Sequence, residues 1–176
     1  MDACVTLALE HGFSHAAVLD AATLTPLDAV RDMCATGACA MYGRCWTCPP
    51  ACGSIAENAA QMARYSSGII VQTTREMDDP FDYETMEECS RAHREQFVEL
   101  CARLREEFSE LLPLGAGGCR LCEACSYPDA PCRKPGEALS SMEAYGLLVS
   151  DVCLKNGLGY YYGEGTFRFT GCFLLV

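Results

Sequence analysis

The apolar and polar positions along the chain predict alternating helices and strands. Between about residues 85 and 112, apolar residues recur every three or four positions, with Glu and Arg between them. This spacing predicts a long amphipathic helix. The run "GIIVQTT" at 68–74 is rich in β-branched residues and is bounded by a glycine and a polar segment, which predicts a strand. A shorter helix is expected at 3–12 and a strand at 15–19.

Helix-start signals add three further helices. Thr25 is a candidate N-cap with Pro26 at the first helical position. Two S-x-x-E capping boxes follow. The box that begins at Ser54 predicts a helix to about residue 66, and the box that begins at Ser140 predicts a helix that ends at Asn156 and Gly157.

The order of these elements indicates the fold class. The aromatic and apolar tail from residue 160 onward predicts a terminal strand or hairpin. Strands then alternate with helices, and 176 residues suffice for one sizeable core. We therefore expect an α/β or α+β fold. It would form a single compact domain over 1–176, with a small mixed sheet flanked by helices and two cysteine-rich metal-binding loops.

Composition and charge narrow the classes of partner. Half of the residues are apolar, but every apolar run is far shorter than the roughly 20 residues of a membrane span. The N-terminus has no basic segment followed by an apolar stretch, so no secretory signal is visible and a cytoplasmic location is expected. The net charge of −11 argues against binding to nucleic acid. Neither a membrane nor a nucleic acid is therefore an expected partner.

Cysteine is the most informative residue type. The chain has 14 cysteines, a density close to that of disulfide-rich secreted domains. Without an export signal, this density favours metal binding over disulfides. Nine of the cysteines fall in two blocks. The first block comprises Cys34, Cys39, Cys45, Cys48 and Cys52, and the second comprises Cys119, Cys122, Cys125 and Cys132.

The second block has the spacing C-x2-C-x2-C-x6-C. Two thiolates in a C-x2-C turn grip one metal centre, and a third at the same interval wraps the chain around a body larger than one ion. Such a triple run is typical of a [4Fe–4S] cluster, although zinc can take the same four thiolates. Cys132 either closes this site or serves a neighbouring one. Arg133 and Lys134 would lie near a negatively charged cluster, or else are solvated cations.

The first block has the irregular spacing C-x4-C-x5-C-x2-C-x3-C. It contains enough thiols for a second site. Outside the blocks, Cys101 lies in the apolar stripe of the long helix and Cys89 lies two turns earlier, so both are expected in the core. The histidines, His11, His15 and His93, are expected as surface or capping groups. No Gly-rich phosphate loop and no Ser–His–Asp or Cys–His arrangement is recognisable.

The cysteine motifs resemble those of an uncharacterised, cysteine-rich "predicted metal-binding protein" family of anaerobic bacteria and archaea. The matching features are the C-x4-C pair, "MYG", "CPP", "CRLCEAC", "CRKP" and "SSMEAYG", spread over about residues 30–176. The resemblance implies metal binding and brings no established activity. The ligands that it implies are Cys34, Cys39, Cys48, Cys119, Cys122, Cys125 and Cys132.

Cys45 and Cys52 do not match the family pattern. Either of them completes a second site, a non-cysteine ligand does so, or one site draws on both blocks. The function predicted first is a protein with one or two [4Fe–4S] clusters that transfers electrons to a redox partner or senses redox state in anaerobic metabolism. A zinc-stabilised binding or adaptor module is the alternative. A second alternative is an enzyme whose cluster is accessible to a substrate of unknown identity.

Overall fold

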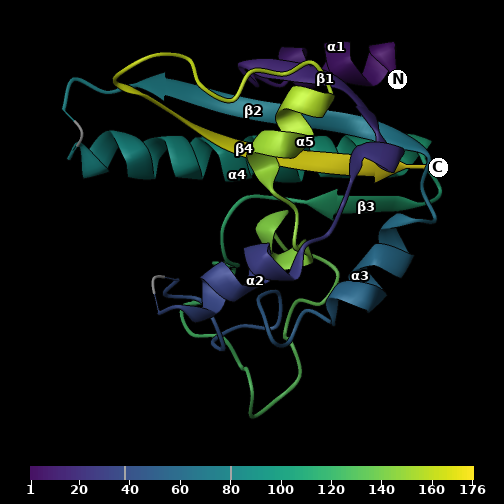
Figure 1. Cartoon of the computed structure of the whole chain (residues 1–176), viewed down its shortest axis with the longest axis vertical. Helices are drawn as coiled ribbons and strands as arrows, with labels where there is room; N and C mark the ends of the chain where they lie inside the picture. Colours follow the sequence, from purple (N-terminus) through teal and green to yellow (C-terminus); the bar gives the residue numbers. More distant parts are fainter. Residues whose placement is uncertain (38, 80) are drawn as a thin grey trace.

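A computed structural model describes residues 1–37, 39–79 and 81–176. Its centre is a four-stranded sheet in the order β1-β2-β4-β3 (Figure 1). All three strand pairings are antiparallel, and one isolated parallel bridge joins Gly115 to Ser141. The predicted α/β or α+β fold with a small sheet flanked by helices is confirmed, but the sheet was expected to be mixed and the described strands pair only antiparallel. The strands are β1 (His15–Asp20), β2 (Ser67–Glu76), β3 (Leu111–Leu114) and β4 (Thr166–Leu175).

The two central strands form the longest pairing. β2 and β4 pair from Ser67 opposite Leu175 to Glu76 opposite Thr166. Gly68 is required where they approach most closely, because a Cβ there would lie 2.1 Å from the carbonyl oxygen of Phe173. The sequence-predicted strands at 15–19 and 68–74 and in the tail are therefore confirmed.

Helices cover both faces of the sheet (Figure 1). Helices α1 (Asp2–Glu10) and α4 (Tyr83–Glu107) cover one face, where Ile69, Leu100 and Phe173 are fully buried. On the other face, α3 (Ile55–Met62), the short 3-10 helix η2 (Glu143–Tyr145) and α5 (Val149–Lys155) contribute to a second apolar cluster around Ile70 and Leu174. Successive residues of β2 alternate between the clusters, as the pleat of a strand requires.

The remaining part of the chain lies beyond β3, at the bottom of Figure 1. It contains α2 (Asp28–Ala35) and α3 and long turns that carry the cysteine blocks. Among the described residues, no helix is long and apolar enough to cross a membrane.

The start of α2 and the end of α4 differ from the sequence-based predictions. α2 begins at Asp28 rather than Pro26, because Leu27 is extended and its N–H donates to the carbonyl of Gly146. α4 ends at Glu107, five residues early. Leu111 and Leu112, predicted as helix, pair instead with β4, where they cover an edge of the sheet.

The helix predicted from Ser140 to Asn156 is divided. Ser140 lies beside Gly115, whose N–H donates to its carbonyl, and the neighbouring Ser141 hydroxyl accepts the N–H of Ala144. Gly146 then separates η2 from α5 with a left-handed φ of 79°. A Cβ at Gly146 would lie 2.5 Å from the Ile55 side chain, so the break is also a packing contact. The predicted end at Asn156 is confirmed, as is the capping box of Ser54 and Glu57.

Candidate metal centre

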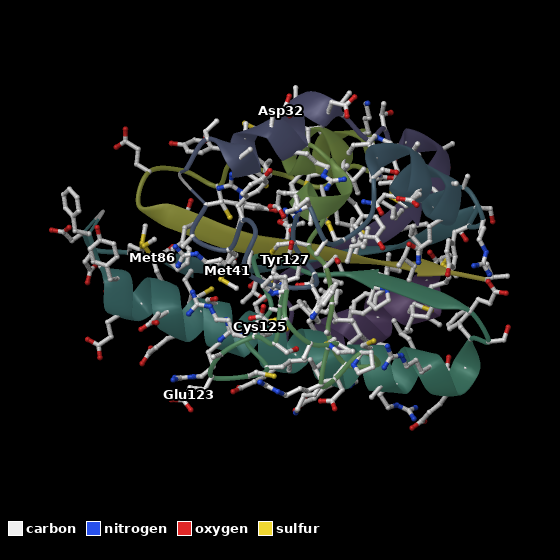
Figure 2. All side chains as sticks on the ribbon, turned by 90° about the horizontal axis from the view of Figure 1, so that it is seen from below. Asp32, Met41, Met86, Glu123, Cys125 and Tyr127 are labelled. Carbon is white, nitrogen blue, oxygen red and sulfur yellow. The ribbon has the colours of Figure 1, made fainter. Side chains whose placement is uncertain are left out.

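The two cysteine blocks are neighbours in space although 67 positions separate Cys52 from Cys119 in the sequence. The indole Nε1 of Trp46 donates a hydrogen bond of 3.1 Å to the carbonyl oxygen of Ala130. The ring of Trp46 also meets that of Tyr127 edge to face, with 5.0 Å between the ring centroids. Figure 2 shows Met41 on the same side of the molecule as Tyr127 and Cys125. The first block therefore forms one wall of the region that the second block occupies.

A cavity of about 340 Å³ lies between the blocks. Its walls contain all four cysteines of the second block together with one cysteine of the first. These are Cys45, Cys119, Cys122, Cys125 and Cys132. A set of soft sulfur donors around one enclosed space matches the ligand chemistry of an iron–sulfur cluster or of zinc.

The thiols of this cavity interact electrostatically. Burial raises the pKa of Cys119, and the neighbouring thiols of Cys45, Cys132 and Cys122 raise it further. Several thiolates are unfavourable in one place unless a positive charge compensates them. A bound cation would supply that charge.

Cys125 differs from Cys119 because it is exposed and accepts hydrogen bonds. The backbone N–H of Tyr127 lowers the pKa of Cys125, with smaller contributions from the N–H groups of Trp46 and Ser126 and the charge of Arg133. A lowered pKa increases the thiolate fraction, which is the form that binds metal. The Trp46 loop therefore supports a ligand candidate that lies in the other block.

Basic side chains surround the thiol cavity in a chain that is acidic overall. Arg44, Arg120, Arg133 and Lys134 line it, and Glu123 is the acidic residue among the lining residues. Arg133 is fixed by a 2.8 Å hydrogen bond from Nη1 to the carbonyl of Ala124. The backbone N–H of Lys134 points at the Cys132 sulfur, 3.4 Å away. Such donors stabilise a thiolate and the negative charge of a thiolate-bound cluster.

The first block forms an adjoining group of thiols. Burial raises the pKa of Cys48, and the nearby thiols of Cys45, Cys39 and Cys52 raise it further. Burial and the thiol of Cys39 likewise raise the pKa of Cys34. The first block thus places the predicted ligands Cys34, Cys39 and Cys48 in one group with the two cysteines that the family pattern left unassigned. These two are Cys45 and Cys52.

Arg31 lies beside Cys52 at the edge of this group. Its Nη2 is 3.9 Å from the Cys52 sulfur, and its Nη1 donates a 2.6 Å hydrogen bond to the carbonyl of Gly53. The Cys52 thiol in turn points to the carbonyl of Ala144 at 3.6 Å. Within the described ranges, no three Cys, His, Asp or Glu side chains are arranged to hold a single metal ion.

Cys45 and His93 are the residues that sequence reasoning placed least well. Cys45 was outside the family pattern, but it is 1 % exposed and lies between the two thiol groups. The C-x2-C spacing of Cys45 and Cys48 is a signal in the sequence that could have identified it. His93 was predicted as a surface or capping group, and this is wrong, because it is 1 % exposed in the core. Cys89 and Cys101 are buried, as predicted.

No curated protein and no solved structure showed significant similarity to the chain. The sequence model of a family described as "Predicted metal-binding protein (DUF2284)" matches residues 17–175, a range that includes both cysteine blocks and the thiol cavity. This match confirms the resemblance inferred from the cysteine motifs, and the description names no particular metal. The chain belongs to this family of predicted metal-binding proteins.

Proposed function

We propose that this protein holds a [4Fe–4S] cluster through Cys119, Cys122, Cys125 and Cys132, and that the cluster serves electron transfer or redox sensing. The observation that carries the proposal is the thiol cavity, whose walls contain all four of these cysteines. A C-x2-C-x2-C run provides three thiolates for three irons of a cube, and Cys132 provides the fourth.

The charge around the thiol cavity supports a cluster with several thiolates. A [4Fe–4S] centre with four thiolate ligands carries net negative charge, and four basic side chains line this cavity. Opposite charges nearby favour the deprotonated thiols. The backbone N–H groups that point at Cys125 and Cys132 act in the same direction.

The position of the cavity suits exchange of electrons with another molecule. Cys125 is exposed, and Cys122 and Cys132 are half-buried, so a bound cluster would lie close to the surface. When bound, such a cluster supplies one-electron redox chemistry. A redox protein is therefore the proposed partner.

The first block supports a second centre. Burial raises the pKa of Cys34, Cys48 and Cys52, and neighbouring thiols of the same group raise each of them further. Cys34 lies near the end of α2, and Cys39, Cys48 and Cys52 lie in the turns between α2 and α3. We assign these four cysteines to the second centre. Cys45 lies between the two centres and lines the first, so its removal is expected to affect both.

Anaerobic purification followed by iron, sulfide and zinc analysis tests the proposal, with electron paramagnetic resonance of the reduced protein. We expect about four irons and four sulfides for each cluster. Cys122→Ala should lose the cluster of the thiol cavity. Cys101→Ala removes a thiol that is buried in α4, away from both blocks, and should retain all the metal. Stoichiometric zinc without sulfide would instead identify the zinc-stabilised module and overturn the cluster proposal.

A further inference from the structure

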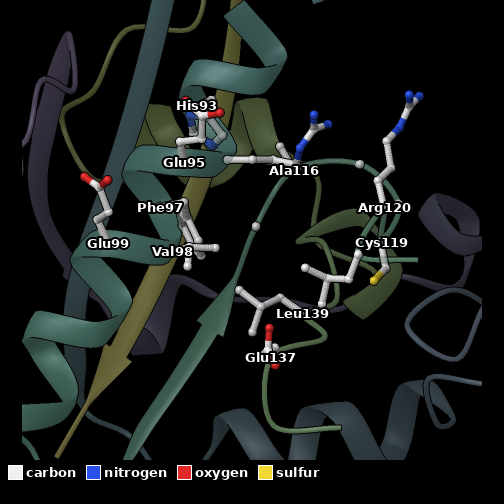
Figure 3. Close-up of a pocket in the computed structure, with 15 residues that line it drawn as sticks. His93, Glu95, Phe97, Val98, Glu99, Ala116, Cys119, Arg120, Glu137 and Leu139 are labelled. Carbon is white, nitrogen blue, oxygen red and sulfur yellow. The ribbon is translucent and has the colours of Figure 1, made fainter. Parts of the chain in front are cut away.

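A second cavity, of about 370 Å³, lies between α4 and the segment 115–121. Its inner wall is apolar, and Figure 3 shows Phe97 and Val98 of α4 facing Leu139 across it. Charged side chains stand at its rim, where Glu95, Glu99, Arg120 and Glu137 are exposed. An apolar interior of this size with a polar rim is typical of a small-molecule site.

His93 is the polar group of the inner wall. The side chain is 1 % exposed, and its Nε2 has no hydrogen-bond partner among the residues that the structure describes. Buried polar atoms in proteins are nearly always paired. An unpaired ring nitrogen on the wall of a cavity therefore indicates a position where a ligand atom belongs.

A chain of hydrogen bonds determines which kind of ligand atom fits. Gln96 Nε2 donates to the carbonyl of Gly12 at 3.1 Å, so Gln96 Oε1 faces Thr73 as an acceptor. The Thr73 hydroxyl has one proton, which it donates to Gln96 Oε1 at 3.1 Å. The oxygen of Thr73 must then accept from Nδ1 of His93, 2.9 Å away.

The tautomer of His93 follows from this network. With the proton on Nδ1, Nε2 keeps its lone pair and acts only as a hydrogen-bond acceptor. Burial, together with the nearby charge of Arg94, lowers the pKa of His93 to about 4, so the ring is neutral near pH 7. His93 therefore contributes a hydrogen-bond acceptor to a cavity whose inner wall is otherwise apolar.

We propose that this cavity binds a small, largely apolar alcohol or phenol whose hydroxyl donates a hydrogen bond to Nε2 of His93. Cys119 lies on the walls of both this cavity and the thiol cavity, so the ligand would lie beside the metal centre. The proposal goes beyond electron transfer, and it does not depend on which metal the thiols bind.

Isothermal titration of the full-length, anaerobically purified protein with two matched probes tests this site. 2-Naphthol carries the hydroxyl donor, whereas 2-methoxynaphthalene keeps the ring system and the oxygen but lacks the proton. We expect 2-naphthol to bind about tenfold more tightly, as one buried hydrogen bond allows. His93→Phe should abolish this preference. Equal affinity for the two probes, or a preference that survives His93→Phe, would overturn the proposal.

A second pair of variants tests the location without altering His93. Val98 is 52 % exposed on α4 and lines the cavity. Val98→Trp should therefore block the cavity and lower the affinity for 2-naphthol at least about tenfold. Leu154→Trp, at a 65 % exposed position of α5, is the matched control and should bind normally. Unchanged binding in Val98→Trp would overturn the assignment. Iron and sulfide analysis of the same samples shows whether a loss of 2-naphthol binding results from loss of the metal centre instead.

Discussion

The sheet and the cysteine loops of this protein are held together by different means. Each face of the sheet lies under a cluster of fully buried apolar side chains, and β2 and β4 pair along ten residues. By contrast, the described residues of 36–54 and 115–142 form turns and isolated bridges, without a helix or a strand of a sheet. The hydrophobic effect thus accounts for the sheet. In the loops, a metal bound to the candidate cysteine ligands would hold the turns together.

Removal of metal should give the largest effect and should separate the two regions. Structural metal ions contribute on the order of 10 kcal/mol to small domains. No described residue of 39–52 or 119–135 belongs to either buried apolar cluster, so these loops have no such core to replace the metal. After anaerobic chelation, we expect amide hydrogen exchange in 39–52 and 119–135 to accelerate by at least about 100-fold. Exchange in β2 and β4 should change by less than about threefold.

The same measurement on Cys101→Ala, with and without chelator, serves as the control. This variant keeps every cysteine of both blocks and should lose protection in the same loops. If chelation accelerates exchange equally in the sheet and the loops, the two regions form one cooperative unit and the comparison fails.

Leu100→Ala should act on the opposite region. Leu100 is a fully buried residue of α4 in the apolar cluster against the sheet, and replacement of a buried Leu by Ala costs about 2–5 kcal/mol. Urea unfolding should show this loss, while the metal content of the folded protein stays unchanged. Val98→Ala, two residues earlier and half-exposed, should change stability by less than about 1 kcal/mol. A loss of metal in folded Leu100→Ala would contradict the separation of the regions.

Acid should weaken the sheet through His93. Its folded pKa of about 4 lies below the ordinary value of 6.5, because burial disfavours the charged ring. Between these values the unfolded chain binds a proton that the folded chain does not, so stability falls as the pH drops from about 6.5 to 4. The contribution is at most roughly 3 kcal/mol.

Urea unfolding of wild type and His93→Gln at pH 7, 5.5 and 4 isolates this contribution as the difference between the two proteins. The wild type should lose more stability than the variant on acidification. Parallel loss in both proteins would show that His93 does not set the acid response. His11→Gln, which alters a half-buried histidine at the end of α1, is the control.

Ser54→Ala should give the smallest effect, at the junction of the two regions. The Ser54 hydroxyl accepts the N–H of Glu57, and the Glu57 carboxylate accepts the N–H of Ser54. Loss of the Ser54 cap costs about 1 kcal/mol in thermal or urea unfolding.

A pH series on the same variant tests the hydrogen bond that the Ser54 hydroxyl donates to the Glu57 carboxylate. The backbone and side chain of Ser54 lower the pKa of Glu57, so this contribution is present above the ordinary pKa of 4.5 and is lost as the pH falls below it. Ser54→Ala should therefore lose less stability than wild type as the pH falls toward 3. An equal acid dependence would show that the Ser54 hydroxyl does not donate to the Glu57 carboxylate in solution.

The elements that sequence predicted well are those determined by local signals. The apolar stripe of α4, the Ser54 capping box and the β-branched residues of β2 lie within short windows, and all three are confirmed. The errors arose where a distant partner determines local structure. Leu111 joined a strand because β4 lies beside it, and Gly146 broke a helix where it packs against Ile55.

The type of ligand at the candidate site could be predicted from the sequence, but the arrangement of the ligands in space could not. The C-x2-C-x2-C spacing predicts Cys119, Cys122 and Cys125 as metal ligands. This spacing carries no information about Cys45. The position of Cys45 depends on the contact between two loops far apart in the chain. His93 was missed for a similar reason, since its burial depends on Phe13, Phe97 and Phe169, which come from three separate segments.

The hydrogen bond between Trp46 and Ala130 has a consequence for the order of synthesis. It joins residues 84 positions apart, so the thiol cavity has only one wall until the second block has been translated. At about 5–20 residues per second, the 67 residues from Cys52 to Cys119 take roughly 3 to 13 seconds. Throughout that interval the nascent chain carries the five cysteines of the first block without the other wall of the cavity. Oxidation of Cys45 on the ribosome would therefore leave a completed chain with a correctly folded sheet and a defective metal centre.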